Sequence, residues 1–317
     1  MREEKSELAL ASVTTSDSLA RRVRRRRLRV AGHSPLYWLG HIPLSLALLF
    51  IAFWTFIPVL WTITTSFKGV KEYYLYSLSL IPHHPTLHNY SFMFKYLPEF
   101  PLYFKNSGIV CVAVVLLNIL FASLMGYAFA RLRFWGRDFL FYSIVISMFI
   151  PRSGGLMAAY ELMSFLHLRN SLLGLILFFS SNLSIALFIM RQTFLGLPRE
   201  IEESAMIDGA SRWKIFLAIA VPYAATGMLV VAILSFVGTW GDYLFTITMI
   251  DVKKYYTVGV GIAMFSGSGH MVEQDPDISQ AGIQAAGYLM AALPAMLLYL
   301  GLQRYFVRGL MEGALKF

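Results

Sequence analysis

Residues 197–222 of this chain read LPREIEESAMIDGASRWKIFLAIAVP, a polar segment that lies between two long apolar runs. Pro198 suits the first position of a helix, and the glutamates that follow it place negative charge at the positive end of the helix dipole. Gly209 can adopt the left-handed conformation that ends a helix, and Ser211 can cap a second one. The segment, called the elbow below, is therefore predicted to form two short helices that meet at a glycine.

The composition of the chain is that of an integral membrane protein. Of the 317 residues, 57% are hydrophobic and only 14% carry a charged side chain. A helix needs about 20 apolar residues to cross roughly 30 Å of hydrocarbon, and the apolar runs lack the alternation of a membrane β-barrel. The sequence predicts an all-α protein with six transmembrane helices, at residues 41–67, 105–130, 138–165, 171–190, 224–249 and 283–303.

The distribution of arginine and lysine predicts the orientation. The first 40 residues hold nine of them, and 19 of the 27 fall in cytoplasmic segments if both termini are cytoplasmic. This count also places the elbow inside the cell. The basic N-terminal run is interpreted through the same rule and through attraction to anionic lipids, rather than as a nucleic-acid site.

A motif within the elbow points to a known family. From Glu203 to Pro222 the spacing is Glu-Ser-Ala, three residues, Gly, nine residues and Ile-x-Val-Pro. It resembles the Glu-Ala-Ala, Gly and Ile-x-Leu-Pro motif of the membrane subunits of binding-protein-dependent ABC importers (type I), with Ser204 and Val221 as the two departures. In that family the motif is the coupling helix that docks in a cleft of the ATPase subunit. The resemblance implies an ATPase-coupling role for Glu203, Ser204, Ala205, Asp208 and Gly209.

Three further strings resemble the carbohydrate-uptake branch of this family, the type of the smaller permease of the maltose transporter. They are NSLLGL at 170–175, WGDYL at 240–244 and QRYFVRG at 303–309. The resemblance covers roughly residues 40 to 317. It implies a permease subunit in the bacterial inner membrane that imports an oligosaccharide together with a second, homologous permease, two ATPase subunits and an external solute-binding protein.

The resemblance also divides the chain. The expected parts are a basic cytoplasmic segment at 1–40, a first transmembrane helix and external loop at 41–104, a permease core at 105–308 that includes the elbow, and a cytoplasmic tail at 309–317. The tail of the family approaches the ATPases, and the same is expected here.

The sequence offers no catalytic machinery of its own. It has no GxxxxGK[ST] loop for nucleotide phosphates, so ATP and Mg²⁺ are expected on the partner ATPases and no cofactor on this chain. It also lacks GxSxG and HExxH motifs, and an enzyme is not predicted. The alternative function is an ion-coupled secondary transporter, which needs acids near mid-membrane. Within the predicted spans, Glu161 and Asp242 lie near the outer ends and Asp138 is the first residue of the third span, so no acid lies near mid-membrane.

Candidate residues for a solute path are polar groups within the spans, because such groups are costly in lipid. Arg152, in the string PRSGG at 151–155, either lines a cavity in an interrupted third span or lies outside a span that ends early. Ser180 and Asn182 lie in a polar cluster midway along the fourth span. On a continuous helix, Ser180, Ser181 and Ser184 share a sector and Asn182 lies 200° from Ser180. Near the outer end of the fifth span, Trp240, Asp242 and Tyr243 either contact a sugar ring or form an interfacial aromatic belt.

Two other features concern metal binding and disulfide formation. His83, His84 and His88 lie in the external loop, but no cysteine or carboxylate stands at ligand spacing beside them, and no metal site is predicted. Cys111 is the only cysteine, so an intrachain disulfide is impossible.

Overall fold

The computed structural model describes residues 35–267 and 277–314 of the chain. All regular elements within those ranges are helical and no strand occurs there, which confirms the all-α class. The chain divides into two compact units, residues 1–61 and 62–317, which are described separately.

The described part of the first unit is most of helix α2 (Pro35–Ser66), which contains Pro43 and Pro58. Its segment His41–Ser66 has a mean hydropathy of 2.2 and is long enough to cross a membrane. The large apolar side chains along it are exposed, as is usual for a helix whose surroundings are apolar. This helix corresponds to the first predicted span.

The second unit holds the remaining described helices. In chain order they are α3 (Val70–Leu75), α4 (His88–Tyr96), α5 (Phe100–Arg131), α6 (Arg137–Ile146), η1 (Ser147–Phe149), η2 (Arg152–Gly155), α7 (Leu156–Phe165), α8 (Leu172–Ser180), α9 (Ser184–Leu195), α10 (Arg199–Ile207), α11 (Arg212–Ile215), η3 (Phe216–Ala220), α12 (Val221–Tyr223), α13 (Ala225–Trp240), α14 (Leu244–Met249), η4 (Lys253–Tyr255), α15 (Val258–Gly267) and α16 (Gln280–Ala314). Of these, η3 is a π-helical turn and the other η elements are 3₁₀ turns.

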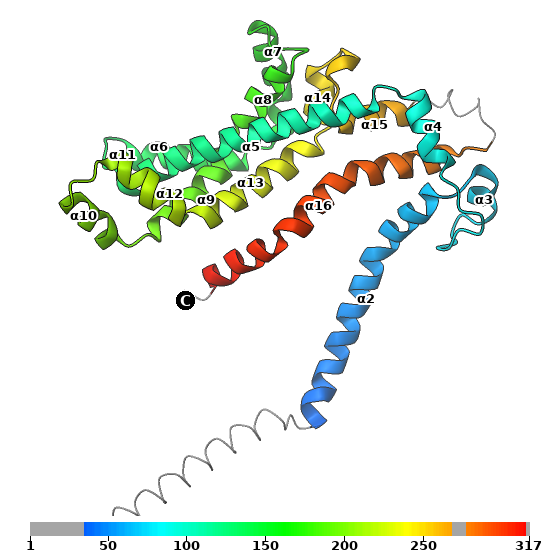
Figure 1. The fold of residues 1–317 in the computed structure, drawn as a ribbon, viewed down its shortest axis with the longest axis horizontal. Helices are drawn as coiled ribbons and strands as arrows, with labels where there is room; N and C mark the ends of the chain where they lie inside the picture. The colour runs from blue at the N-terminus through cyan, green and yellow to red at the C-terminus, as the bar shows by residue number, and fades with distance from the viewer. Residues whose placement is uncertain (1–34, 268–276, 315–317) are drawn as a thin grey trace, which may run out of the picture. The chain divides into compact units, whose positions relative to one another are not determined.

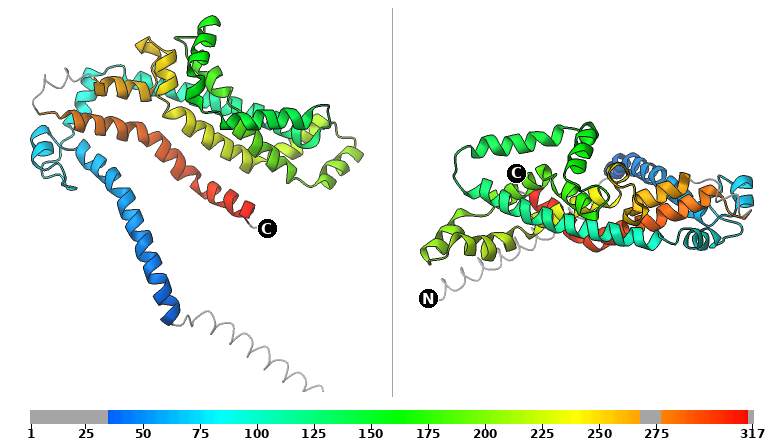
Figure 2. Two further views of the ribbon diagram at one scale, coloured as in Figure 1. Left: turned by 180° about the vertical axis from the view of Figure 1, so that it is seen from behind. Right: turned by 90° about the horizontal axis from the view of Figure 1, so that it is seen from above.

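Helix α5 is the centre of this unit and packs against α9 and α13 (Figure 1). Gly126 lets α5 and α9 approach closely, because a Cβ at this position would lie 2.7 Å from the Cβ of Met190. Gly227 does the same for α13 and α9, since its Cβ would lie 2.4 Å from the Thr193 hydroxyl oxygen. Figures 1 and 2 show α10 and α11 at one end of α5, and α4 and α15 at the other.

Three of the predicted spans are not single helices. The third, 138–165, divides into α6 and α7 with 3₁₀ turns between them. The fourth bends by 49° between α8 and α9, and the fifth ends as a helix at Trp240 before the short α14. In the described residues, three helices are long and apolar enough to cross a membrane, or up to five if each bent pair counts as one span. The prediction of six transmembrane helices is therefore not confirmed.

Local chemistry explains these breaks. Pro151 has no N–H to donate and separates η1 from η2. Between α8 and α9, the Ser181 hydroxyl donates to the Phe178 carbonyl at 2.7 Å and so competes with the helical pattern. After α13, the Asp242 carboxylate accepts from two backbone N–H groups of α14 and so starts a separate helix. Mean hydropathy depends only on composition, so it does not detect any of these three breaks.

The predicted external loop is held by two charged side chains. Lys68 is fully buried, and its Nζ donates to the carbonyl oxygens of Tyr76, at 2.9 Å, and Ser79, at 2.6 Å. The Glu72 carboxylate accepts from the backbone N–H groups of His83 and His84. Among the described residues no cluster of three His, Cys, Asp or Glu is suited to hold a metal.

Candidate functional site

The elbow consists of α10 and α11, joined at a glycine in the left-handed conformation. Gly209 has φ 81°, and its N–H donates to the Met206 carbonyl while the Ala210 N–H donates to the Ala205 carbonyl at 2.9 Å. This hydrogen-bond pair is the Schellman arrangement that ends a helix. Ser211 then caps α11 by accepting from the Lys214 N–H at 3.3 Å.

One detail of the predicted elbow is wrong by a single position. Pro198 is the N-cap of α10, with φ −59° and ψ 133°, and Arg199 is the first helical residue. The extended ψ of Pro198 turns the chain from α9 into α10. Helix ends shift by a residue with small changes of backbone angle, and the fixed φ of proline suits either place.

The predicted ATPase-coupling residues lie together at the outside of α10 and its end. Glu203, Ser204, Asp208 and Gly209 are exposed, and Ala205 is partly buried. Apolar side chains are exposed beside them: Ile207 is 87% exposed, and Ile201 and Met206 are each 47% exposed. These three side chains point in different directions around α10, and Ile207, at the end of the helix, is the most exposed of them.

Glu202 fastens this helix to α5. Its carboxylate lies 3.1 Å from Nε of Arg131 and accepts from the Tyr127 hydroxyl at 3.1 Å. Arg131 also donates to the carbonyl of Leu197, just before α10. The Tyr127 ring packs 5.0 Å from that of Phe216 at the start of η3. Sequence reasoning assigned Glu202 only to the helix dipole, because nothing in the local pattern shows that Arg131 comes close.

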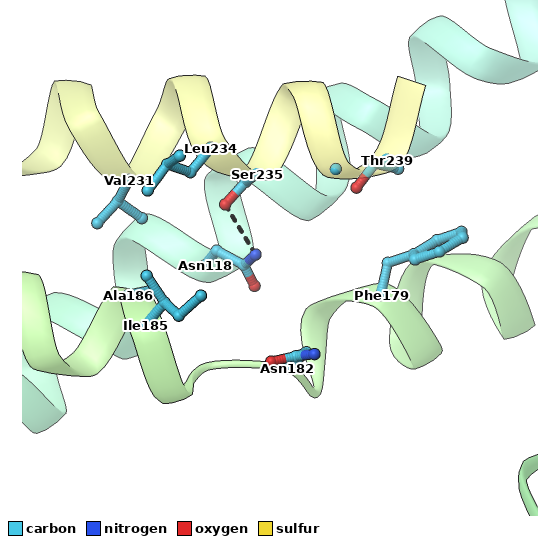
Figure 3. Close-up of a pocket in the computed structure, with 10 residues that line it drawn as sticks. Asn118, Phe179, Asn182, Ile185, Ala186, Val231, Leu234, Ser235 and Thr239 are labelled. Carbon is cyan, nitrogen blue, oxygen red and sulfur yellow. Dashed lines mark hydrogen bonds between the residues drawn. The ribbon is translucent and has the colours of Figure 1, made fainter. Parts of the chain in front are cut away.

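A cavity of about 160 Å³ lies between α5, α13 and the break that separates α8 from α9 (Figure 3). Its polar lining comes from three directions, with Asn118 on α5, Ser235 and Thr239 on α13, and Asn182 in the break. The Asn118 amide donates to the Ser235 hydroxyl at 2.9 Å. Its carbonyl oxygen is buried and has no hydrogen-bond partner among the described residues. Asn118 was missed although an asparagine amid an apolar run was a readable signal.

Asn182 also lines a second cavity, of about 260 Å³, on the other side of the break. Ser147, Ser181 and Ser184 contribute to it, and the hydroxyls of Ser147 and Ser184 lie 2.7 Å apart. The angular argument for this cluster is wrong, because no continuous helix runs through residues 181–183. The break lets Asn182 contribute to both cavities.

The other predicted path residues have different surroundings. Ser180 is buried, and its hydroxyl has no partner among the described residues. Trp240 is buried against Phe236 and donates from its ring N–H to the Ala291 carbonyl at 2.9 Å. Asp242 accepts from the backbone N–H groups of Phe245 and Thr246 and so caps α14.

Neither Trp240 nor Asp242 nor Tyr243 lines the Asn118 cavity. Tyr243, the residue before α14, is 43% exposed. Arg152 begins η2, and its side chain lies outside the described part of the structure. The tail was expected from residue 309, but α16 continues to Ala314, and residues 315–317 lie outside the described range.

The string at 170–175 closes a tight turn between α7 and α8. Asn170 has φ 54°, and its side-chain oxygen accepts from the N–H groups of Asp251, at 2.6 Å, and Val252. Ser171 caps α8 by accepting from the Gly174 N–H at 3.0 Å. A Cβ at Gly174 would lie 2.1 Å from the Leu168 carbonyl oxygen, so only glycine fits.

Comparison with known proteins agrees with this architecture. The family described as binding-protein-dependent transport system inner membrane component matches residues 118–312. The arabinooligosaccharides transport system permease protein AraQ of Halalkalibacterium halodurans is 31% identical, over 89% of this chain and 97% of that protein. The galactooligosaccharides transport system permease protein GanQ of Bacillus subtilis is also 31% identical, over 87% and 96%.

A solved structure has a similar fold. It is the crystal structure of a bacterial ABC transporter involved in the import of the acidic polysaccharide alginate, and one of its chains superposes with a TM-score of 0.77 at 18% identity. The match covers 87% of this chain and 99% of that one.

Proposed function

This chain belongs to the family of binding-protein-dependent transport system inner membrane components, and on that premise we propose that it forms half of an ATP-driven import pathway for an oligosaccharide. The other half is a second, homologous permease. Two ATPase subunits bind ATP and Mg²⁺ on the cytoplasmic side, where both termini of this chain lie, and an external binding protein delivers the solute. The oligosaccharide is inferred from the names of the relatives.

The observation that carries this proposal is the exposed elbow. Ile207 is 87% exposed at the end of α10, within the segment that carries the family motif, and a docking partner would remove its apolar surface from water. Glu203 and Asp208 beside it are exposed and available for polar contacts. A cleft in an ATPase that receives a short helix covers both kinds of side chain.

Coupling follows from the attachment of the elbow to α5. The buried pair of Glu202 with Arg131 ties α10 to the end of a membrane-spanning helix. When the ATPases close on ATP, a displacement of α10 is therefore passed to α5 and to the helices packed on it. The helices rock between inward-facing and outward-facing arrangements, and the solute enters a transient cavity.

Replacing Ile207 by aspartate tests the docking surface. We expect the variant to insert and fold normally, because the side chain has almost no contacts of its own, and to lose co-purification with the ATPase and ATP-driven uptake. Leu78→Asp is the matched control, since Leu78 is also 87% exposed but lies in the predicted external loop. If the Ile207→Asp variant co-purifies with the ATPase and supports ATP-driven uptake at wild-type levels, Ile207 is not part of the docking surface.

The solute path is proposed to pass the Asn118 cavity. Asn118 lies at the middle of α5, Ser235 and Thr239 lie in the last turns of α13, and Asn182 lies in the break, all within apolar segments where amides and hydroxyls are retained at a cost. Sugar hydroxyls both donate and accept hydrogen bonds, so they match the unpaired carbonyl of Asn118 and the amide of Asn182. Asn182 stands at the break between α8 and α9, where a bend can open or close the path.

Cysteine labelling tests this path. Asn182→Cys in a Cys111→Ser background should react with a small water-soluble thiol reagent in the outward-facing state of the full complex. Val112→Cys, which is exposed on α5 and lies outside the lining of both cavities, is the control for a lipid-facing position. If Asn182→Cys is labelled no more than the control, both with and without nucleotide, Asn182 does not line an aqueous path. Its role is then a structural hydrogen bond.

A further inference from the structure

Another cavity, of about 180 Å³, lies where the end of α5 meets α10 and α11. Its charged lining is strongly unbalanced, because five of these side chains are positive and two are negative. They are Arg131, Arg133, Arg137, Arg199, Arg212, Glu202 and Glu203. Arg133, Arg199 and Arg212 are exposed, so an anion in solution or at a membrane surface can reach them, and the excess positive charge around one space favours its binding.

Internal partners satisfy only part of this charge. Arg131 pairs with Glu202, and Nε of Arg137 lies 2.9 Å from the carboxylate of its neighbour Asp138. No ion pair within the described residues involves Arg133, Arg199 or Arg212. Three cationic side chains from three segments, the α5–α6 loop, α10 and α11, are therefore available around one cavity. Guanidinium groups match the oxygens of a phosphate group in both geometry and charge.

The cavity lies at the boundary between membrane and water. Helix α5 has a mean hydropathy of 2.6 in its most apolar window, spans a membrane by length, and ends at Arg131 in the cavity wall. Large aromatic side chains are exposed next to the arginines: Trp135 is 98% exposed, Phe139 is 76% exposed and Trp213 is 62% exposed. Tryptophan beside arginine at the end of a span is typical of the headgroup layer.

We propose that this cavity binds the phosphate headgroup of an anionic membrane lipid. Arg133, Arg199 and Arg212 hold the phosphate oxygens, and Trp135 and Trp213 lie against the upper part of the acyl chains. A carboxylate from a partner protein would satisfy the arginines equally well, but it leaves the two exposed tryptophans at the end of a span unexplained. The bound lipid joins the α5–α6 loop to both helices of the elbow.

This inference requires only that α5 crosses a membrane, so it stands or falls separately from ATPase docking. The full complex, purified in detergent, is incubated with equimolar phosphatidylglycerol and phosphatidylcholine, and bound lipids are counted by native mass spectrometry. We expect phosphatidylglycerol to be retained in preference. Because each basic residue near an anionic lipid strengthens its binding, the triple variant R133Q/R199Q/R212Q should lose roughly 100-fold of this preference.

Two further variants guard the test. The triple variant K71Q/K105Q/K253Q removes the same charge from exposed lysines elsewhere and should keep the preference. R133K/R199K/R212K keeps the charge, and its retention of lipid shows that the loss in the glutamine variant is not a folding defect. Equal phosphatidylglycerol retention in the glutamine variant and the wild type overturns the proposal. Displacement of the lipid by inorganic phosphate alone also overturns it. If the glutamine variant loses ATPase co-purification but retains the lipid, the arginines bind a carboxylate of the partner protein instead.

Discussion

Replacing Glu202 by glutamine removes the negative charge that pairs with Arg131 and leaves the shape of the side chain unchanged. The two side chains are 9% and 7% exposed, and the ionic contact between them measures 3.1 Å. Breaking a buried pair costs about 3–5 kcal/mol, because the remaining charge stays buried without its partner. Since the neighbouring cavity lets water approach Arg131, we expect the lower end, about 3 kcal/mol.

A loss of about 3 kcal/mol raises the population of elbow released from α5 by roughly 100-fold, since 1.4 kcal/mol corresponds to a factor of ten. Hydrogen exchange of the backbone amides of residues 197–211 in the full complex measures this population directly. Exchange in this segment should accelerate by that factor, while the amides of α5 near Asn118 keep their protection. ATP hydrolysis should continue with little uptake, because the ATPase then moves an elbow that no longer moves α5.

Glu200→Gln is the matched control, since Glu200 lies on the same helix, is exposed and is not among the residues assigned to the ATPase contact. Its exchange rates should equal those of the wild type. A double-mutant cycle with Arg131→Gln isolates the pair, and we expect a coupling free energy of about 2 kcal/mol or more. If Glu202→Gln leaves both the exchange of the elbow and the coupling of ATP hydrolysis to uptake unchanged, the attachment role assigned to this pair is refuted.

Three other predictions follow from the structure. Gly174→Ala should lower the unfolding temperature and the yield of folded protein, because the added Cβ would lie 2.1 Å from the Leu168 carbonyl oxygen. The control, Gly108→Ala, should be neutral or slightly stabilising, because no atom lies within 4 Å of its added Cβ. Uptake by proteoliposomes that hold the full complex, binding protein and ATP should continue when ionophores collapse the proton and sodium gradients. If uptake stops although ATP is saturating, an ion-coupled transporter is favoured. A cysteine at Ala314, near the end of α16, should crosslink to the ATPases in at least one nucleotide state, and failure in every state argues for a terminus that makes no contact.

The elbow was predictable because its signals are local. A proline, a glycine with positive φ and a capping serine each act on the backbone within a few residues. The start of α10 differs from expectation by one position, and Gly209 and Ser211 take the roles expected of them. The family motif lies in the same segment, so the two kinds of inference support each other.

What sequence reasoning missed depends on contacts between distant segments. Glu202 meets Arg131 across 71 positions, and Asn118 meets Ser235 across 117. Hydropathy windows average over about 20 residues and therefore treated the break at 181–183 as the middle of one helix. The same averaging placed Asp242 inside a span, whereas it caps α14 in the gap after α13.

The Asn118 cavity has a consequence for the electrical tightness of the membrane. All ten residues that line it are uncharged, so it can hold water and sugar hydroxyls but offers no fixed charge to compensate a dehydrated ion. An ion that enters such a space loses most of its hydration and gains only weak dipoles, which is a high barrier to conduction. On the proposed solute path, a polar but neutral cavity of this kind would accept sugar hydroxyls while it opposes the passage of ions.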